Sequence, residues 1–335
     1  MTRYIIRRIL WFIPVLFGVT LATFILVRAI PGGPFDFVGD KSLPPAIVAN
    51  LEAKYHTDWP VWKQFVSYLI GDEFLDPEGK SRGLIRLDLG PSFRYRNRTV
   101  NELLAVSLPV SAQLGIFALA LALLIGIPMG IIAALKQNSL LDYGATFVAI
   151  LGRSIPNMVL GPLLMWVLAL KLGWFPVATW GTKPPYFLGF IPKPTLDFFT
   201  HAALPAITLG TGLSALIARL MRASLLQVIR EDYIRTARAK GLRERVVIIR
   251  HALKNSLIPV MTVLGPLFAA ILTGTFIVEQ IFGVPGMGKH FTQSIGNRDY
   301  AVITGVTLIY GIFLVIANLM VDISYAWLDP RIRYE

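Results

Sequence analysis

The amino-acid sequence predicts an all-α integral membrane protein with six transmembrane helices and a larger segment outside the membrane after the first helix. Of its 335 residues, 55% are hydrophobic and 16% are charged, whereas soluble globular domains carry about 25% charged residues. Charged residues are absent from whole stretches of the chain: there is no Asp, Glu, Lys or Arg in Val106–Leu135, Leu257–Val278 or Ala301–Val321. A helix of about 20 apolar residues crosses a bilayer, so each block can span a membrane.

Long apolar stretches occur six times along the chain, with short polar or basic segments between most of them. The predicted spans are Ile9–Ile30, Val106–Leu135, Tyr143–Lys171, His201–Leu226, Leu257–Ile281 and Tyr300–Leu328. Lys and Arg beside a span favour the cytoplasmic side, and an even number of spans returns both ends of the chain to the same side. We therefore expect the N-terminus and the tail, residues 329–335, in the cytoplasm.

The first span, within residues 1–30, follows Arg3, Arg7 and Arg8. A cleaved signal peptide is the alternative, but its apolar region would be shorter and small residues would precede the cleavage site, where this chain has Arg28. The sequence favours an uncleaved membrane anchor with its basic end in the cytoplasm.

Residues 31–98 form the predicted extracytoplasmic segment. One amphipathic helix is expected after Pro44-Pro45, and a second is expected to open with Asp58 as its N-cap. Thr99 and Glu102 have the spacing of a capping box, which would start the helix that leads into the second span.

A strongly basic segment follows the fourth span, and residues 227–256 are called the basic loop below. From Arg219 to Lys254 the sequence has ten Lys or Arg and three acids, which predicts a cytoplasmic position. Helical spacing puts Tyr233, Ala237 and Lys240-Gly241 on one face, and Gly241 is suited to a left-handed cap. A second helix is expected over Arg243–Ser256, with an interruption at Pro259. The small residues suit docking on another protein, while the charge equally suits anionic lipid.

Several other functions find little support in the sequence. There is no Cys, and the four His are scattered without metal-ligand spacing. The net charge of +12 lies at loops beside the spans, which argues against nucleic acid. Gly283–His290 nearly matches a phosphate-binding loop, but His290 replaces the magnesium-binding hydroxyl and Pro285 lacks an N–H, so a tight turn is expected. Glu279 and Asp322 lie near span ends and are interpreted as structural.

The strings YIRTARAKGL (Tyr233–Leu242) and RHALKNSLIPV (Arg250–Val260) resemble the binding-protein-dependent ABC importer permeases of the peptide/nickel branch, and most closely the B-type permease of oligopeptide or dipeptide importers. The same similarity extends to other strings in order: LDLGPSFRYRNRTVNELL (Leu87–Leu104), SLPVSAQLG (Ser107–Gly115), AALKQNSLLDY (Ala133–Tyr143), EQIFGVPGMG (Glu279–Gly288), NRDYAV (Asn297–Val302) and DISYAWLDPRIRY (Asp322–Tyr334). The general family pattern begins Glu-Ala-Ala, whereas this chain has Arg235-Thr236-Ala237, so no role passes to the missing glutamate.

This resemblance implies a type I ABC importer permease of MetI-like fold, with its core over residues 99–328, in a bacterial cytoplasmic (inner) membrane. It implies ATP-driven import of oligopeptides or dipeptides together with a second homologous permease, two ABC ATPase subunits, an extracytoplasmic peptide-binding protein and membrane lipid. ATP and Mg would be bound by the ATPase subunits, and no catalytic site, cofactor or metal is expected in this chain. The residues implied in the ATPase-coupling loop are Tyr233, Ala237, Lys240, Gly241 and Leu242.

Arg153 lies about ten residues into the predicted third span, within Gly152–Asn157. A charge in a span is costly and normally faces a cavity or a partner. Arg153, with Ser154, Pro156 and Asn157, is therefore a candidate for the translocation pathway, and the alternative is a pair with an acid or carbonyl of the neighbouring permease.

The substrate is open among peptides, nickel chelates, glutathione-like molecules and peptide antibiotics. An ion-coupled secondary transporter is the competing class. It is opposed by the scarcity of carboxylates within the spans and by the absence of an evident internal repeat.

Overall fold

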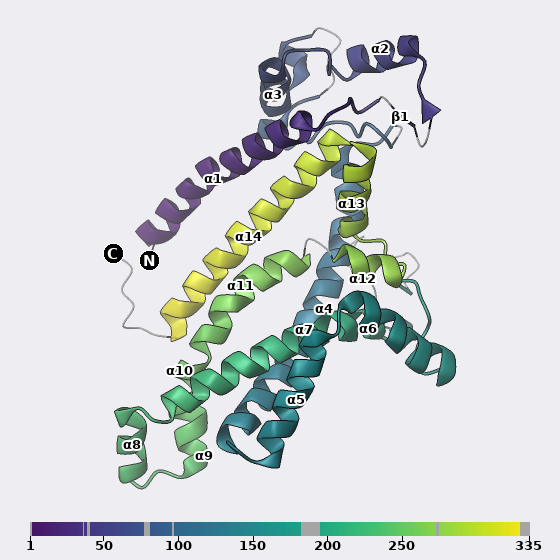
Figure 1. The fold of residues 1–335 in the computed structure, drawn as a ribbon. Coiled ribbons are helices and arrows are strands. Elements are labelled where there is room, and N and C mark those ends of the chain that lie inside the picture. Colours follow the sequence, from purple (N-terminus) through teal and green to yellow (C-terminus); the bar gives the residue numbers. More distant parts are fainter. Residues whose placement is uncertain are drawn as a thin grey trace.

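The computed structural model describes residues 2–35, 37–38, 41–76, 81–95, 97–181, 195–272 and 275–328, so the predicted tail at 329–335 lies outside the described residues. Figure 1 shows an elongated helical bundle. Its helices are α1 (Thr2–Ala29), α2 (Pro45–Lys54), α3 (Val61–Ile70), α4 (Val100–Leu135), α5 (Leu140–Ser154), α6 (Asn157–Leu164), α7 (Leu196–Val228), α8 (Asp232–Ala239), α9 (Glu244–Val246), α10 (Leu253–Ser256), α11 (Ile258–Leu272), α12 (Phe276–Ile281), α13 (Met287–Asn297) and α14 (Tyr300–Leu328).

Short elements complete the described chain. Two-residue strands β1 (Phe37–Val38) and β2 (Lys41–Ser42) pair antiparallel, a small exception to the all-α prediction. Met165–Lys171 and Val247–Ala252 are π-helical, and Asp72–Phe74 and Leu84–Arg86 are single 3₁₀ turns.

The apolar helices are compatible with the predicted spans. Within the described residues, four helices are long and apolar enough to cross a membrane, and the number rises to six if each of two bent helix pairs is one span. These pairs are Leu140–Ser154 with Asn157–Lys171, bent by 103°, and Glu244–Ser256 with Ile258–Ile271, bent by 46°. The second bend lies just before Pro259, where an interruption was predicted.

The predicted third span, Tyr143–Lys171, is not one continuous helix. The chain breaks at Ile155, whose backbone is extended, and Pro156 precedes the first residue of α6. Proline disfavours the helical conformation of the residue before it and lacks the N–H that a continuing helix needs. Arg153 therefore lies in the last turn of α5 rather than inside an unbroken helix.

The other element boundaries also shift for local reasons. The fifth predicted span ends early, because α11 stops at Leu272 and α12 is a separate helix. The Asp58 N-cap is wrong, since α3 begins at Val61 after Pro60 and the residue before a proline is held out of the helical region. The Thr99 capping box is confirmed, with its hydroxyl accepting from the Glu102 N–H at 3.2 Å and the Glu102 carboxylate accepting from the Thr99 N–H at 3.3 Å.

Helices α4 and α7 form the centre of the bundle through close packing at glycines. A Cβ added to Gly126 would lie 2.7 Å from the carbonyl oxygen of Ser214, and one added to Gly130 would lie 2.6 Å from that of Ala218. Small residues allow such backbone approach between membrane helices. The two helices are thus held at a separation that larger residues would not permit.

The two terminal helices lie side by side, and Arg8 of α1 pairs with Asp322 of α14 at 2.6 Å. The N-terminal end of α1, the C-terminal end of α14 and the α8–α9 region lie toward one side of the molecule, and α2, α3 and β1 lie at the other (Figure 1). The structural interpretation of Asp322 agrees with this pair.

The segment that resembles a phosphate-binding loop is a tight turn around Glu279. The buried Glu279 carboxylate accepts from the Ser111 hydroxyl at 2.7 Å and from the Gly288 N–H at 3.0 Å, and the same hydroxyl accepts from the Met287 N–H at 2.7 Å. A Cβ at Gly286 would lie 2.4 Å from the Glu279 side chain, so a larger residue does not fit. The loop is filled by the protein's own carboxylate.

Candidate functional site

The basic loop folds back on itself as a pair of short helical segments with an apolar inner side. Ile234 and Ala237 of α8 are buried in one cluster with Val247, Ile248 and Ala252. The two α8 residues are three apart and therefore share a helix face. The same cluster includes Met221 and Leu225 of α7. The loop is consequently packed against the long central helix.

Gly241 ends this first segment in the left-handed conformation, as the sequence predicted. Its φ is +75°, and its N–H donates to the carbonyl oxygen of Arg238 at 2.9 Å. Glycine adopts this conformation without the steric cost that a Cβ brings. No atom lies within 4 Å of the position that a Cβ would take, so the turn is open to the surroundings.

The outer side of the basic loop is exposed and carries charged residues together with apolar ones such as Leu242 and Ile249. Tyr233 and Leu242 are each 40% exposed, and the Tyr233 hydroxyl accepts from the Asn255 amide at 2.8 Å. Arg238 makes a two-point pair with Glu244, at 2.7 and 3.1 Å, and these hydrogen bonds raise the pKa of the Arg238 guanidinium.

Ala237 does not share the outward face that the sequence predicted for it. Its side chain is only 6% exposed and packs within this chain, because the inward-facing Ile234 lies three residues before it. Tyr233, Lys240, Gly241 and Leu242 remain exposed. These four are the predicted coupling residues that another protein could contact, and their role as such stays a prediction.

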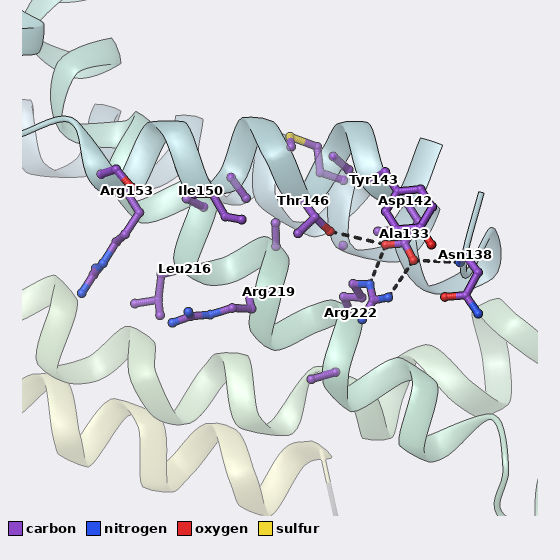
Figure 2. A pocket seen from close by; sticks show the side chains of 18 residues that line it. Ala133, Asn138, Asp142, Tyr143, Thr146, Ile150, Arg153, Leu216, Arg219 and Arg222 are labelled. Atoms are coloured by element: carbon purple, nitrogen blue, oxygen red, sulfur yellow. Dashed lines mark hydrogen bonds and ion pairs between the residues drawn. The ribbon is translucent and has the colours of Figure 1, made fainter. Parts of the chain in front are cut away.

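A second feature is a groove of about 500 Å³ between α4, α5 and α7, called the arginine groove below. Figure 2 shows its lining, which combines many apolar side chains with three arginines. The lining residues are Met129, Gly130, Ala133, Asn138, Asp142, Tyr143, Ala145, Thr146, Ala149, Ile150, Arg153, Ser154, Ala215, Leu216, Ala218, Arg219, Arg222 and Ala223.

One end of the arginine groove is lined by an ion pair in which the carboxylate is buried and the guanidinium is partly exposed. Nε and Nη2 of Arg222 donate to the two Asp142 carboxylate oxygens at 2.7 and 2.6 Å. Asp142 also accepts from the Asn138 N–H at 3.0 Å and the Thr146 hydroxyl at 3.4 Å. The Ser139 hydroxyl caps the start of α5 by accepting from the Asp142 N–H. The pair joins α5 to α7 where α5 begins.

Of the candidate pathway residues, Arg153 and Ser154 line the groove, whereas Pro156 and Asn157 lie beyond the break and are not among its lining residues. Arg219 and Arg222 were not singled out from the sequence. Both fall inside the predicted fourth span, and a charge within a span is itself a sign of a functional or paired residue. A charged residue within a predicted span is visible in the sequence, and searching for it would have identified both arginines.

Comparison with known proteins identifies the family to which the chain is similar and the fold that it shares with a solved structure. Residues 126–334 match the family model described as the binding-protein-dependent transport system inner membrane component, and residues 1–115 match the model of the N-terminal part of such components. Among solved structures, an inward-facing MetNI methionine ABC transporter has a chain with a TM-score of 0.53 and 16% identity, over 68% of this chain and 97% of that one. This likeness confirms the predicted MetI-like fold.

Curated relatives extend the match to the whole chain. The dipeptide transport system permease protein DppB of Bacillus subtilis is 43% identical over 333 residues, covering 99% of this chain and 98% of its own. The oligopeptide transport system permease protein OppB of Salmonella typhimurium is 41% identical over 334 residues, covering all of both chains. The chain belongs to the family of binding-protein-dependent transport system inner membrane components, which confirms the resemblance read from the sequence.

Proposed function

We propose that this chain is one transmembrane half of an ATP-driven importer that carries short peptides across a bacterial inner membrane. The observation that carries the proposal is the similarity along the full chain to permeases of dipeptide and oligopeptide transport systems. The exposed basic loop supports it, since such a loop offers a docking surface for a separate ATPase.

The assembly proposed around this chain has a second homologous permease, two ABC ATPase subunits that bind ATP and Mg, and an extracytoplasmic peptide-binding protein. The chain itself would contribute no catalytic site and no cofactor. The basic loop and both termini would face the cytoplasm. The Arg8–Asp322 pair supports a common side for the two terminal helix ends, and the charge of the basic loop supports a cytoplasmic position for that side.

The packing of the basic loop suggests how work from the ATPases would reach the bundle. Ile234 and Ala237 share a core with Met221 and Leu225 of α7, so a displacement of α8 would move α7 as well. Because α7 carries Arg219 and Arg222, the arginine groove would change with it. Rigid-body motion of packed helices is an established kind of switching transition.

Substitution of Gly241 tests the docking face. Gly241→Trp adds a bulky side chain that projects into open space and should reduce co-purification of the ATPase subunits and ATP-dependent dipeptide uptake together. Gly241→Ala is the matched control, because it carries a similar left-handed strain, roughly 1–2 kcal/mol, without the bulk. The control should keep association and uptake close to the original chain, and both variants should insert into the membrane.

Normal co-purification of the Gly241→Trp variant would mean that the ATPases dock elsewhere. Equal losses in both variants would assign the effect to backbone strain. Dipeptide uptake by liposomes that contain this permease without ATPase subunits would end the importer proposal and favour an ion-coupled carrier.

A further inference from the structure

Two arginines in the arginine groove have no acidic neighbour to neutralise them. Arg153 comes from the last turn of α5 and Arg219 from α7, and both side chains extend toward the part of the groove beside Leu216 (Figure 2). Among the lining residues, which all belong to the described chain, Asp142 is the single acid, and its two oxygens already receive the fork of Arg222. In the part of the chain that the structure describes, no hydrogen bond or ion pair is found for the side chain of Arg153 or Arg219.

Two guanidinium groups in such a setting are complementary to an anion. A charge within a membrane span is costly unless it faces water, a counter-charge or a substrate. The rest of this part of the groove is mainly apolar, with Ile150, Leu216 and Ala149 in its lining, and Ser154 follows Arg153. Guanidinium presents a planar pair of N–H donors that matches the two oxygens of a carboxylate. The groove therefore suits a carboxylate whose neighbouring part of the ligand is apolar.

The depth of Arg153 decides between a lipid headgroup and a molecule that passes through the bundle. Arg153 is eleven residues beyond Asp142 along α5, which corresponds to about 16 Å of helix. The hydrocarbon layer is about 30 Å thick. With the start of α5 at the membrane surface, as the topology proposed above requires, Arg153 would lie about halfway across it. Lipid phosphates lie at the surface of the bilayer. At that depth Arg153 would be about 15 Å from the nearest lipid phosphates, half of the hydrocarbon thickness, so we take a molecule that moves along the groove as its ligand.

The three arginines are staggered along the groove. Arg222 and Arg219 are three residues apart on α7, a rise of about 4.5 Å, and Arg219 is the one nearer to the middle of the bundle. Gly152 of α5 packs against Thr211, and a Cβ there would lie 2.9 Å from the Thr211 methyl group. Gly152 and Thr211 therefore lie at the same level along the two helices. Measured along the helix axis, the backbone of Arg153 lies roughly 12 Å from that of Arg219, which is the rise of the eight residues from Thr211 to Arg219. One carboxylate would therefore meet Arg153 and then Arg219 as it moved toward the basic loop.

We propose that Arg153 and Arg219 form a two-step binding path for the carboxylate of a peptide substrate, and that they make this permease favour peptides with a free C-terminal carboxylate. The inference rests on the proposed peptide-import function. Arg222 is excluded from the path, because its Nε and Nη2 already bind the Asp142 carboxylate, whose charge balances its own. Its task is to hold α5 against α7 at the end of the groove.

The experiment uses the complete complex in liposomes, with its binding protein, and compares uptake of dialanine with uptake of dialanine amide. For each peptide, the rate of a variant is divided by that of the original complex, so that the peptide's affinity for the binding protein cancels. Arg153→Gln and Arg219→Gln should each lower dialanine uptake about tenfold, the equivalent of one charged hydrogen bond. Uptake of the amide should change less than about twofold. Arg219→Lys should retain most of the preference for dialanine over dialanine amide, since lysine keeps the positive charge.

Lys136→Gln is the matched control. Lys136 is exposed at the end of α4 and is not among the lining residues, so this variant removes one positive charge beside the groove without touching it. Both uptake rates should stay unchanged. A second measurement keeps the test valid if the original complex does not take up dialanine amide. A diazirine-bearing dipeptide should crosslink to Leu216, and dialanine but not its amide should reduce the crosslink.

Equal losses for both peptides in the Arg219→Gln variant would overturn the inference, because they would mean that the arginines pair with an acid of another subunit. Unchanged uptake of both would overturn it as well. A crosslink at Leu216 that both peptides reduce equally would also refute carboxylate recognition. If the original complex takes up neither peptide with ATP, the peptide-import function itself fails, and that result is distinct from a working importer without charge preference.

Discussion

Replacing Arg222 by glutamine removes both hydrogen bonds that the Asp142 carboxylate receives from the guanidinium. The two partners differ in their access to solvent, since the Asp142 side chain is 3% exposed and the Arg222 side chain is 30% exposed. After the substitution, Asp142 keeps only the Asn138 N–H at 3.0 Å and the Thr146 hydroxyl at 3.4 Å. A buried carboxylate is then left without its cation.

The exposure of each partner sets the expected magnitudes. Breaking a buried pair by removal of one partner costs about 3–5 kcal/mol, so Arg222→Gln should lower the free energy of unfolding by about 4 kcal/mol. Asp142→Asn leaves a cation that reaches solvent, and it should cost about 1–2 kcal/mol. In the double variant no buried charge remains unpaired. It should cost about 1–2 kcal/mol, less than Arg222→Gln alone.

The measurement is unfolding of the purified chain in detergent, followed by pulse proteolysis over a denaturant series, for the original chain, both single variants and the double variant. The diagnostic result is recovery of stability when Asp142→Asn is added to Arg222→Gln. If the two single variants cost the same, or if their effects add in the double variant, Asp142 is not held as a buried charge by Arg222 and the reasoning is refuted.

Two further predictions use the same unfolding assay. Gly130→Ala places a methyl group 2.6 Å from a backbone oxygen of α7 and should destabilise the chain by about 1–3 kcal/mol. Gly144→Ala is the control: its Cβ would meet nothing within 4 Å, and it should stabilise the chain by up to about 1 kcal/mol. Effects of the same sign in the two variants would contradict close packing of α4 on α7. Burial and the positive charges of Lys289 and Arg98 lower the pKa of His290, so His290 resists protonation in the folded chain. The stability that neutral His290 contributes is therefore complete above about pH 6.5, the pKa of an unperturbed histidine. It falls as the pH drops from there through the lower pKa of the folded state. His290→Gln should lack this part of the pH dependence, and identical pH profiles for the variant and the original chain would count against the assignment.

Local sequence features predicted much of the fold, because they act through nearby residues. The length of apolar blocks identified the membrane segments. The capping box at Thr99 and the left-handed Gly241 were readable because capping depends on residues within one turn. The break at Ile155 was readable in principle, since Pro156 restricts the residue before it, but the apolar run through this point concealed it.

What the sequence by itself determined is a membrane bundle with a basic loop and a family membership, because hydropathy, charge beside spans and ordered motifs are properties of neighbouring residues. Only the tertiary structure decided that Ala237 faces inward, that Asp142 takes the fork of Arg222, and that Arg153 and Arg219 share one groove. Asp142 and Arg222, like Arg153 and Arg219, are more than sixty positions apart in the chain, and their meeting depends on how α4, α5 and α7 pack. Such packing is set by glycine contacts and helix breaks acting together, which no local pattern specifies.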